Sequence, residues 1–220
     1  MTKLGAGYSL SEIEAHAKKA VRGAGFSWGH AEEAAKSVRF LAAHQLPGAA
    51  ALAAYLQGRA ASGTYSRPVM SASVWSVVEG VTALCPLLSG GCLCDNAQVL
   101  MRSENGLVLE KLSYPLLVVP YLALMSRQGG VSLRVCWAGV ELTCHEGRVE
   151  RLICSDDALA VARTERFECE VIAVDTVAGV EAGNLGQVIS DAVWLGLNEF
   201  ACCTYVAATE ASRRGAGPAD

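Results

Sequence analysis

The longest stretch of the chain without a charged residue runs from Phe40 to Gly58, and it limits what this protein can be. A membrane-spanning helix needs about 20 consecutive apolar residues. This stretch is interrupted by Pro47-Gly48 and carries His44 and Gln45. The most apolar run, residues 115–125, is shorter still and contains a second proline. Neither segment is therefore expected to cross a membrane, and both are expected to be buried inside a soluble protein.

The composition supports the same class. Of 220 residues, 52% are hydrophobic and only 18% are charged, which excludes a disordered chain and suffices for a large core. The net charge of −4 argues against a general nucleic-acid-binding surface. The first residues lack the apolar core of a secretory signal. We therefore expect a cytoplasmic protein that binds neither nucleic acid nor membranes.

Three helices are expected in the first third of the chain. The segment Ser9–Glu12 fits a capping box, in which the serine and glutamate side chains bond to free amides of the first turn, and apolar residues then recur at helical spacing to residue 24. A second helix is expected over about residues 30–45. A third, alanine-rich helix should reach about Leu56, with Gly58 as its C-terminal cap. Together they predict a helical subdomain over residues 1–62.

The remainder favours strands. Residues 131–137 alternate strictly between apolar and polar side chains, and residues 141–144 and 148–154 flank a turn at 145–147, as in a hairpin. Strands are also expected at 107–112 and 167–174, and helices at 120–125 and 184–201. Residues 74–78 fit a helix or a strand, and 89–91 fit a turn or a close backbone approach. We predict an α+β fold with a mostly antiparallel central sheet and a long C-terminal helix. Residues 1–220 would form a single domain whose mixed part spans 70–220.

The nine cysteines are odd in number and irregularly spaced, which is typical of reduced core residues and not of a disulfide framework. A mixed metal site built from Cys85, Cys92, Cys94 and Asp95 is an alternative, but the second pair of ligands that structural zinc sites use is missing. We expect no bound metal, while metal binding by Cys92 and Cys94 stays open.

The histidines and glycine-rich segments give no catalytic motif. His145 follows Cys144, but neighbouring residues on a strand point to opposite faces, which argues against a nucleophile–base pair. His16 and His30 are expected on solvated helix faces, and His44 near a helix end, where the dipole favours it. Residues 23–25 and 5–7 do not follow strands, so they fail as dinucleotide-binding loops, and no cofactor is predicted.

The C-terminal segment is the one polar cluster that indicates a ligand. Two consecutive arginines lie among hydroxyl side chains and glycines, and arginine can bind a carboxylate or phosphate with two hydrogen bonds. The alternative is a frayed terminus. The candidate ligand-binding residues for a small anion are Tyr205, Thr209, Glu210, Ser212 and Arg213.

Three blocks of the sequence resemble a bacterial domain family of unknown function: residues 9–34, the segment Cys85–Gly90 and residues 204–217. Ala207 departs from this pattern, in which a proline is expected. Residues 9–58 are also similar to the N-terminal part of the malate/lactate/sulfolactate dehydrogenase family, which uses a nicotinamide cofactor. That family places a serine-histidine-glycine motif after its second helix. The motif is absent from residues 43–49, so His44 does not inherit a catalytic role.

These observations leave three classes of function. The first is a non-catalytic or regulatory protein that acts through self-association, as a homo-oligomer, or through a partner, because standard catalytic motifs are absent. The second is a small-molecule-binding protein, or an enzyme distantly related to nicotinamide-dependent malate/lactate dehydrogenases, with an anion site in the C-terminal segment. The third is a thiol or metal protein centred on Cys92 and Cys94.

Overall fold

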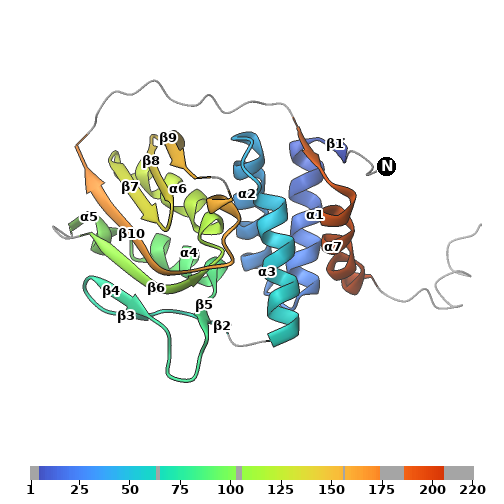
Figure 1. Cartoon of the computed structure of the whole chain (residues 1–220), viewed down its shortest axis with the longest axis horizontal. Coiled ribbons are helices and arrows are strands. Elements are labelled where there is room, and N and C mark those ends of the chain that lie inside the picture. Colours follow the sequence, from blue (N-terminus) through green and yellow to red (C-terminus); the bar gives the residue numbers. More distant parts are fainter. Residues whose placement is uncertain (1–4, 63–64, 103–105, 156, 174–185, 206–220) are drawn as a thin grey trace, which may run out of the picture.

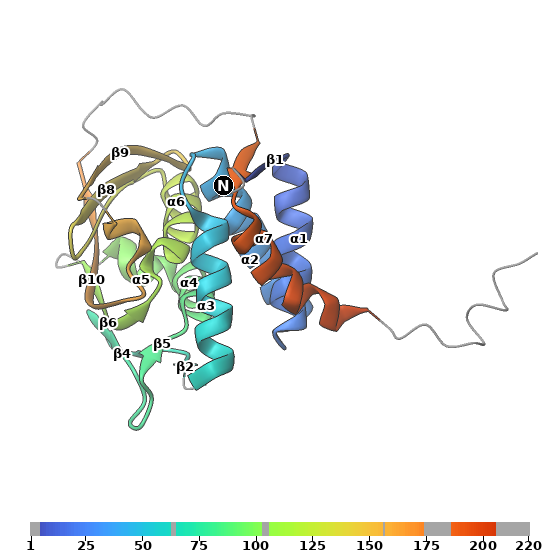
Figure 2. The ribbon, with the colours of Figure 1, turned by 45° about the vertical axis from the view of Figure 1, so that its right-hand side comes forward.

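The computed structural model describes residues 5–62, 65–102, 106–155, 157–173 and 186–205, which form an α+β fold. One side of the molecule is a layer of four helices that lie side by side (Figures 1 and 2). The other side is a mixed sheet with further helices packed against it. The seven α-helices are α1 (Leu10–Gly23), α2 (Trp28–Ala43), α3 (Gly48–Ser62), α4 (Pro86–Asp95), α5 (Ala97–Arg102), α6 (Val119–Gly129) and α7 (Asp191–Ala201).

The helical layer consists of α1, α2, α3 and α7. The predicted capping box begins α1: the Ser9 hydroxyl accepts a hydrogen bond from the Glu12 amide at 3.2 Å, and the Glu12 carboxylate accepts one from the Ser9 amide at 2.8 Å. Alanines on the inner faces of α1 and α2 are fully buried, which allows the close packing that their small side chains favour. Among the described residues, no helix has the length and apolar character that a bilayer crossing requires.

The main sheet runs in the order β2-β5-β6-β10-β7-β8-β9, and β4 pairs with both β3 and β6. Pairing is antiparallel except where β6 meets β4 and β5, and where β2 meets β5. The strands are β2 (Tyr65–Ser66), β3 (Val69–Met70), β4 (Val74–Ser76), β5 (Ala83–Leu84), β6 (Leu107–Ser113), β7 (Ser132–Trp137), β8 (Val140–His145), β9 (Arg148–Cys154) and β10 (Arg163–Ile172). The predicted mostly antiparallel sheet is therefore confirmed.

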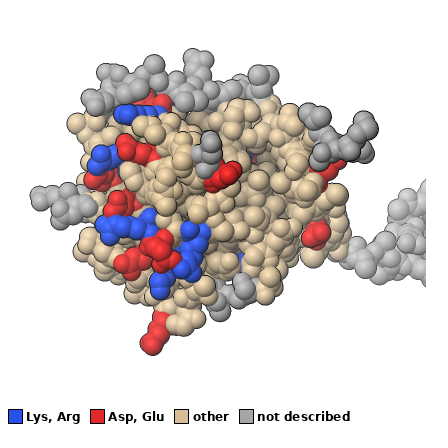
Figure 3. Space-filling view, viewed as in Figure 1, with Lys and Arg blue, Asp and Glu red and all other residues tan. Residues whose placement is uncertain are grey.

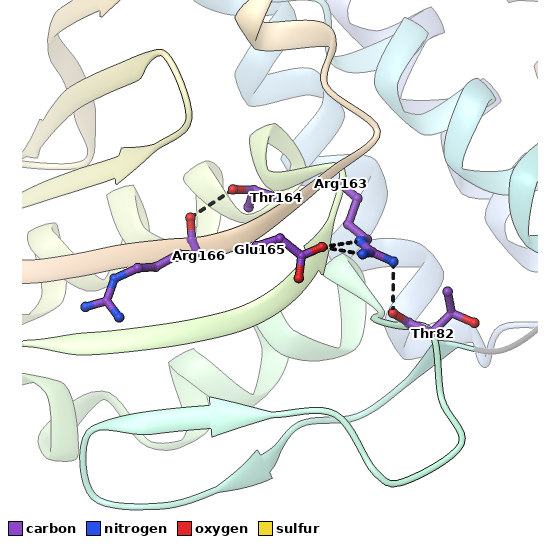
Figure 4. Close-up of polar contacts among 5 residues, drawn as sticks. All are labelled: Thr82, Arg163, Thr164, Glu165 and Arg166. Atoms are coloured by element: carbon purple, nitrogen blue, oxygen red, sulfur yellow. Dashed lines mark hydrogen bonds and ion pairs between the residues drawn. The ribbon is translucent and has the colours of Figure 1, made fainter.

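The two faces of the sheet differ sharply. The inner face carries buried residues such as Leu109, Phe167 and Val135, and it joins the helices in one buried apolar cluster. The outer face carries charged residues of both signs, which gather over the sheet in Figure 3. Three ion pairs lie there, namely Arg134–Glu170, Arg163–Glu165 and Arg166–Glu168. Figure 4 shows the second of them, with Arg163 also donating to the Thr82 carbonyl. Pairs this exposed contribute little to the stability of the fold.

A second, two-stranded sheet joins the beginning of the described chain to its end. Strand β1 (Ala6–Tyr8) pairs antiparallel with β11 (Gln187–Ile189), in the register Ala6↔Ile189. At the other end of the two helices that follow these strands, α1 and α7 approach so closely that a Cβ atom on Gly23 would lie 1.8 Å from the Phe200 carbonyl oxygen. Only glycine fits at this crossing.

Several expected boundaries need correction. The C-terminal helix begins at Asp191 and not near 184, because residues 187–189 pair with β1 and the Ser190 hydroxyl caps the helix through the Val193 amide. Residues 184 and 185 lie outside the described residues. Helix α3 continues past Gly58 to residue 62, so Gly58 is not its cap. Residues 74–76 form a strand, and residues 89–91 lie inside α4, where a close approach to Tyr121, and not a turn, explains Gly90.

Candidate binding cavity

A cavity of about 500 Å³ lies among α2, α4 and α6. Helix α2 supplies one face, from residues that recur at helical spacing: His30, Glu33, Ser37 and Phe40. The other walls come from α4, from α6, from Arg67 and from the β8–β9 turn at Gly147. Its volume falls in the range of about 300–1,000 Å³ that is typical of small-molecule sites.

Apolar side chains form much of the cavity lining, namely those of Phe40, Leu88, Pro120 and Leu124. Tyr121 lines it as well and is only 5% exposed. The Tyr121 hydroxyl is buried and has no hydrogen-bond partner in the described structure. Burial raises the pKa of this phenol, although the nearby Ser37 hydroxyl opposes the rise. Tyr121 is therefore a neutral group that can still donate or accept a hydrogen bond.

Five charged side chains line the cavity: Glu33, Lys36, Arg67, Asp95 and Arg127. In the described part of the chain, none of them forms an ion pair within 4.0 Å. The two carboxylates lie on the same side, because a Cβ atom on Gly91 would lie 3.7 Å from Glu33 Oε2 and Asp95 follows one turn after Gly91 on α4. Burial is the main cause that raises the pKa of Cys94 to about 11, and the charges of Glu33 and Asp95 add to it. These five charges can interact with a ligand without breaking an existing pair.

The cysteines do not form a metal centre with their neighbours. Cys92 and Cys94 both line the cavity, and the Cys94 thiol donates to the Tyr121 carbonyl at 3.8 Å. Cys85 is buried and accepts a hydrogen bond from the Tyr55 hydroxyl at 2.9 Å. Within the described residues, no group of three or more histidine, cysteine or acidic side chains is placed to hold a metal ion.

Two histidines are held by backbone groups. His44 follows the last turn of α2, as expected near a helix end; its Nδ1 bonds to the Phe40 carbonyl at 2.9 Å, and its Nε2 accepts from the Val149 amide at 3.5 Å. With both nitrogens bonded to the backbone, His44 has a structural role. His16 is not on a solvated face: it is half-buried, stacks on Trp194 at 4.0 Å and bonds to the Trp194 carbonyl. Helix α7 covers this face of α1.

The remaining two histidines lie at the ends of regular elements, His145 as the last residue of β8 and His30 in the first turn of α2. His145 is half-buried while Cys144 is fully buried, so the two side chains point to opposite faces of β8, as expected. The His145 Nδ1 pairs with the Ser132 hydroxyl at 2.9 Å. His30 lines the cavity and pairs with the Ser27 hydroxyl at 2.8 Å, so it is half-buried and not on a solvated face.

Of the candidate ligand-binding residues at the C-terminus, only Tyr205 lies within the described residues. Its side chain is 61% exposed, with the Lys19 ammonium 5.5 Å from the ring centroid. Tyr205 does not line the cavity. Thr209, Glu210, Ser212 and Arg213 lie outside the described residues.

Comparisons with known proteins give a family likeness for the first part of the chain. Residues 8–84 match the model of a family described as a protein of unknown function (DUF3726). This match supports the resemblance to an uncharacterised family and includes α2. No curated protein matches the chain. Among solved structures, malate dehydrogenase from Entamoeba histolytica is similar at 12% identity and a TM-score of 0.45. The alignment covers 79% of this chain and 51% of the dehydrogenase, so the chain spans about half of that structure.

The cavity was not found from the sequence. Its residues come from five separate segments of the chain, and the charges on α2 look like an ordinary solvated helix face. One local signal was present: His30, Glu33, Ser37 and Phe40 follow helical spacing and combine polar with aromatic side chains. That spacing alone does not distinguish a cavity wall from a surface.

Proposed function

We propose that this protein binds a small organic molecule in the cavity among α2, α4 and α6. The observation that carries the proposal is a cavity of about 500 Å³ that combines an apolar lining with five charged side chains that are not paired with each other. A pocket with apolar walls and a few polar groups is the usual form of a ligand site. The buried, unpartnered hydroxyl of Tyr121 adds support, because buried polar groups normally have a partner.

The proposal places the ligand at the interface between the helical layer and the sheet. Helix α2 belongs to the layer, whereas α4 and α6 pack on the sheet side. A ligand that binds only the folded chain would stabilise it by an amount that rises with the logarithm of the ligand concentration above Kd. Ligand binding is therefore measurable as a rise in the melting temperature.

The test compares substitutions at two glycines that both have room for a side chain, only one of which lines the cavity. A Cβ atom on Gly91 has room, with Glu33 Oε2 the nearest atom at 3.7 Å, and the position lines the cavity. A Cβ atom on Gly29 also has room, with its nearest contact at 4.0 Å, but the position is away from the cavity. We expect Gly91→Phe to fill the cavity and Gly29→Phe to leave it open.

The measurement is a thermal-shift screen of metabolites and nucleotides, followed by calorimetric titration of each hit. We expect at least one compound to stabilise the wild type and the Gly29→Phe variant but not the Gly91→Phe variant. If every hit stabilises all three proteins equally, the cavity is not the binding site. A screen without hits would also refute the proposal.

The C-terminal segment is a second candidate site, for a small anion. The proximity of Lys19 to Tyr205 favours it, because it places a cation beside the start of the segment. The test is Arg213→Ala: it should remove stabilisation by an anion without changing binding in the cavity. A regulatory role through self-association is proposed from the sequence alone, and light scattering that shows a strict monomer would count against it.

A further inference from the structure

The cavity has two ends that can be located from contacts. Helices α2 and α6 run along it in the same direction. At one end, α4 lies against both helices: a Cβ atom on Gly90 would meet the Tyr121 ring of α6, and one on Gly91 would lie 3.7 Å from Glu33 Oε2 of α2. At the other end, both helices finish at the β8–β9 hairpin: His44, after α2, bonds to the Val149 amide, and the side chain of Arg127 lies against Gly147.

The end beside Tyr121 is acidic. Glu33 of α2 reaches α4, because a Cβ atom on Gly91 would lie 3.7 Å from Glu33 Oε2, and Asp95 follows one turn after Gly91 on the same helix. Helix α4 also ends here, and the C-terminus of a helix carries a partial negative charge. The Tyr121 hydroxyl, which is buried without a partner, can accept a hydrogen bond at this end. Two carboxylates, a helix C-terminus and a free acceptor together favour a bound cation.

The end beside the hairpin is basic. Arg127 lies six residues after Tyr121 on α6, or roughly 9 Å along the axis at 1.5 Å per residue. Lys36 lies one turn after Glu33 on α2 and also lines the cavity. Arg67 also lines the cavity, but it lies on the α4 side, where its charge and that of Asp95 both act on Cys92, so it does not belong to this end. Phe40 and Leu124 line the cavity as well and provide apolar contact surface.

We infer that the ligand is a dipolar molecule, with an amine that binds at Glu33 and Asp95, an acid group that binds at Arg127, and an apolar segment between them. This inference rests on the proposed function and specifies its ligand class. A purely anionic ligand would leave Glu33 and Asp95 facing the same cavity without a cation. A purely cationic ligand would leave Arg127 and Lys36 unpaired in the same way.

The test compares three probes of similar length: aminooctanoate, octanoate and octylamine. Calorimetric titrations at neutral pH and low salt measure the dissociation constant of each probe. We expect aminooctanoate to bind the wild type about tenfold more tightly than either singly charged probe, because it alone forms charge-assisted hydrogen bonds at both ends of the cavity. Gly91→Phe should abolish binding of all three probes.

Two substitutions test the acidic and the basic end of the cavity separately. Glu33→Gln should weaken the binding of aminooctanoate and octylamine about tenfold, because only the amine loses its partner. The dissociation constant of octanoate should stay unchanged. Arg127→Gln should weaken the binding of aminooctanoate and octanoate and leave the dissociation constant of octylamine unchanged. Glu79→Gln is the matched control, because Glu79 is an exposed acid that does not line the cavity.

Three results would overturn the dipolar class. One is octanoate or octylamine binding the wild type as tightly as aminooctanoate. Another is Glu33→Gln behaving like Glu79→Gln with every probe. The third is that none of the three probes binds. In each case the proposed function is judged separately, by whether the compounds found in the broader screen lose binding in Gly91→Phe.

Discussion

From the contact between α4 and α6 we predict how alanine substitutions at two neighbouring glycines change the free energy of unfolding. A Cβ atom on Gly90 would lie 2.3, 2.5 and 2.6 Å from three carbons of the Tyr121 ring. Tyr121 is 5% exposed, and one of the three carbons is the ring Cγ, so relieving these contacts requires the whole ring to shift. At Gly91 a Cβ atom has its nearest contact at 3.7 Å. Alanine should therefore have opposite effects at these two adjacent helical positions.

The magnitudes follow from two opposing effects. Replacing glycine by alanine in a helix interior is worth about 0.8–1 kcal/mol. Forcing an extra methyl group into a packed core costs about 1–3 kcal/mol, and the three short contacts place Gly90→Ala at the upper end. We expect Gly90→Ala to lower the free energy of unfolding by about 1–2 kcal/mol. Gly91→Ala should raise it by about 0.5–1 kcal/mol.

Urea unfolding followed by far-UV circular dichroism measures both changes, as shifts of the midpoint at constant slope. A double-mutant cycle with Tyr121→Leu identifies the cause, because the cost of Gly90→Ala should largely disappear once the ring is removed. The reasoning is refuted if Gly90→Ala is as stable as Gly91→Ala. It is also refuted if the cost of Gly90→Ala persists in the Tyr121→Leu background.

Further predictions concern the capping box, the buried histidines and the thiols. Ser9→Ala should lower the free energy of unfolding by about 1 kcal/mol in the same urea assay, because α1 loses its capping box; an unchanged midpoint would contradict this. Burial lowers the pKa values of His16 and His44, so the unfolded chain takes up protons first as the pH falls. Stability should therefore decrease below about pH 6.5 and be insensitive to these groups above it, and a double substitution of both histidines by glutamine should flatten the pH profile below about 6.5. Burial raises the pKa of Cys144 to about 12 and that of Cys169 well above its usual value, so neither should react with a thiol reagent in the folded protein. Mass spectrometry should find the label instead on the exposed cysteines Cys154, Cys202 and Cys203.

Local patterns in the sequence predicted the elements whose structure depends on near neighbours. The capping box at Ser9 and Glu12 involves four consecutive residues, and the strict alternation over 131–137 reflects a sheet with one buried face. The hairpin at 145–147 is of the same kind, because its turn and both strands are contiguous. In each case the residues that decide the structure are adjacent in the chain.

Features that depend on distant contacts were missed. The segment 187–189 directly precedes helix α7, and it forms a strand only because β1 pairs with it. The sequence around His16 predicts a solvated side chain, but Trp194 of α7, which is distant in the chain, stacks on its ring. The cavity was missed for the same reason, since α2, α4 and α6 each contribute part of a wall that is unremarkable by itself.

The pairing of β1 with β11 also has a consequence for the order of biosynthesis. Helix α1 leaves the ribosome early, but its partner α7 and the strand that pairs with β1 are made about 180 residues later. At 5–20 residues per second, that interval lasts roughly 10–40 s. Until then the contacts of Gly23 with Phe200 and of His16 with Trp194 cannot form. The face of α1 that carries these two residues therefore stays exposed. The helical layer is thus completed after the sheet strands β2–β10 have been synthesised.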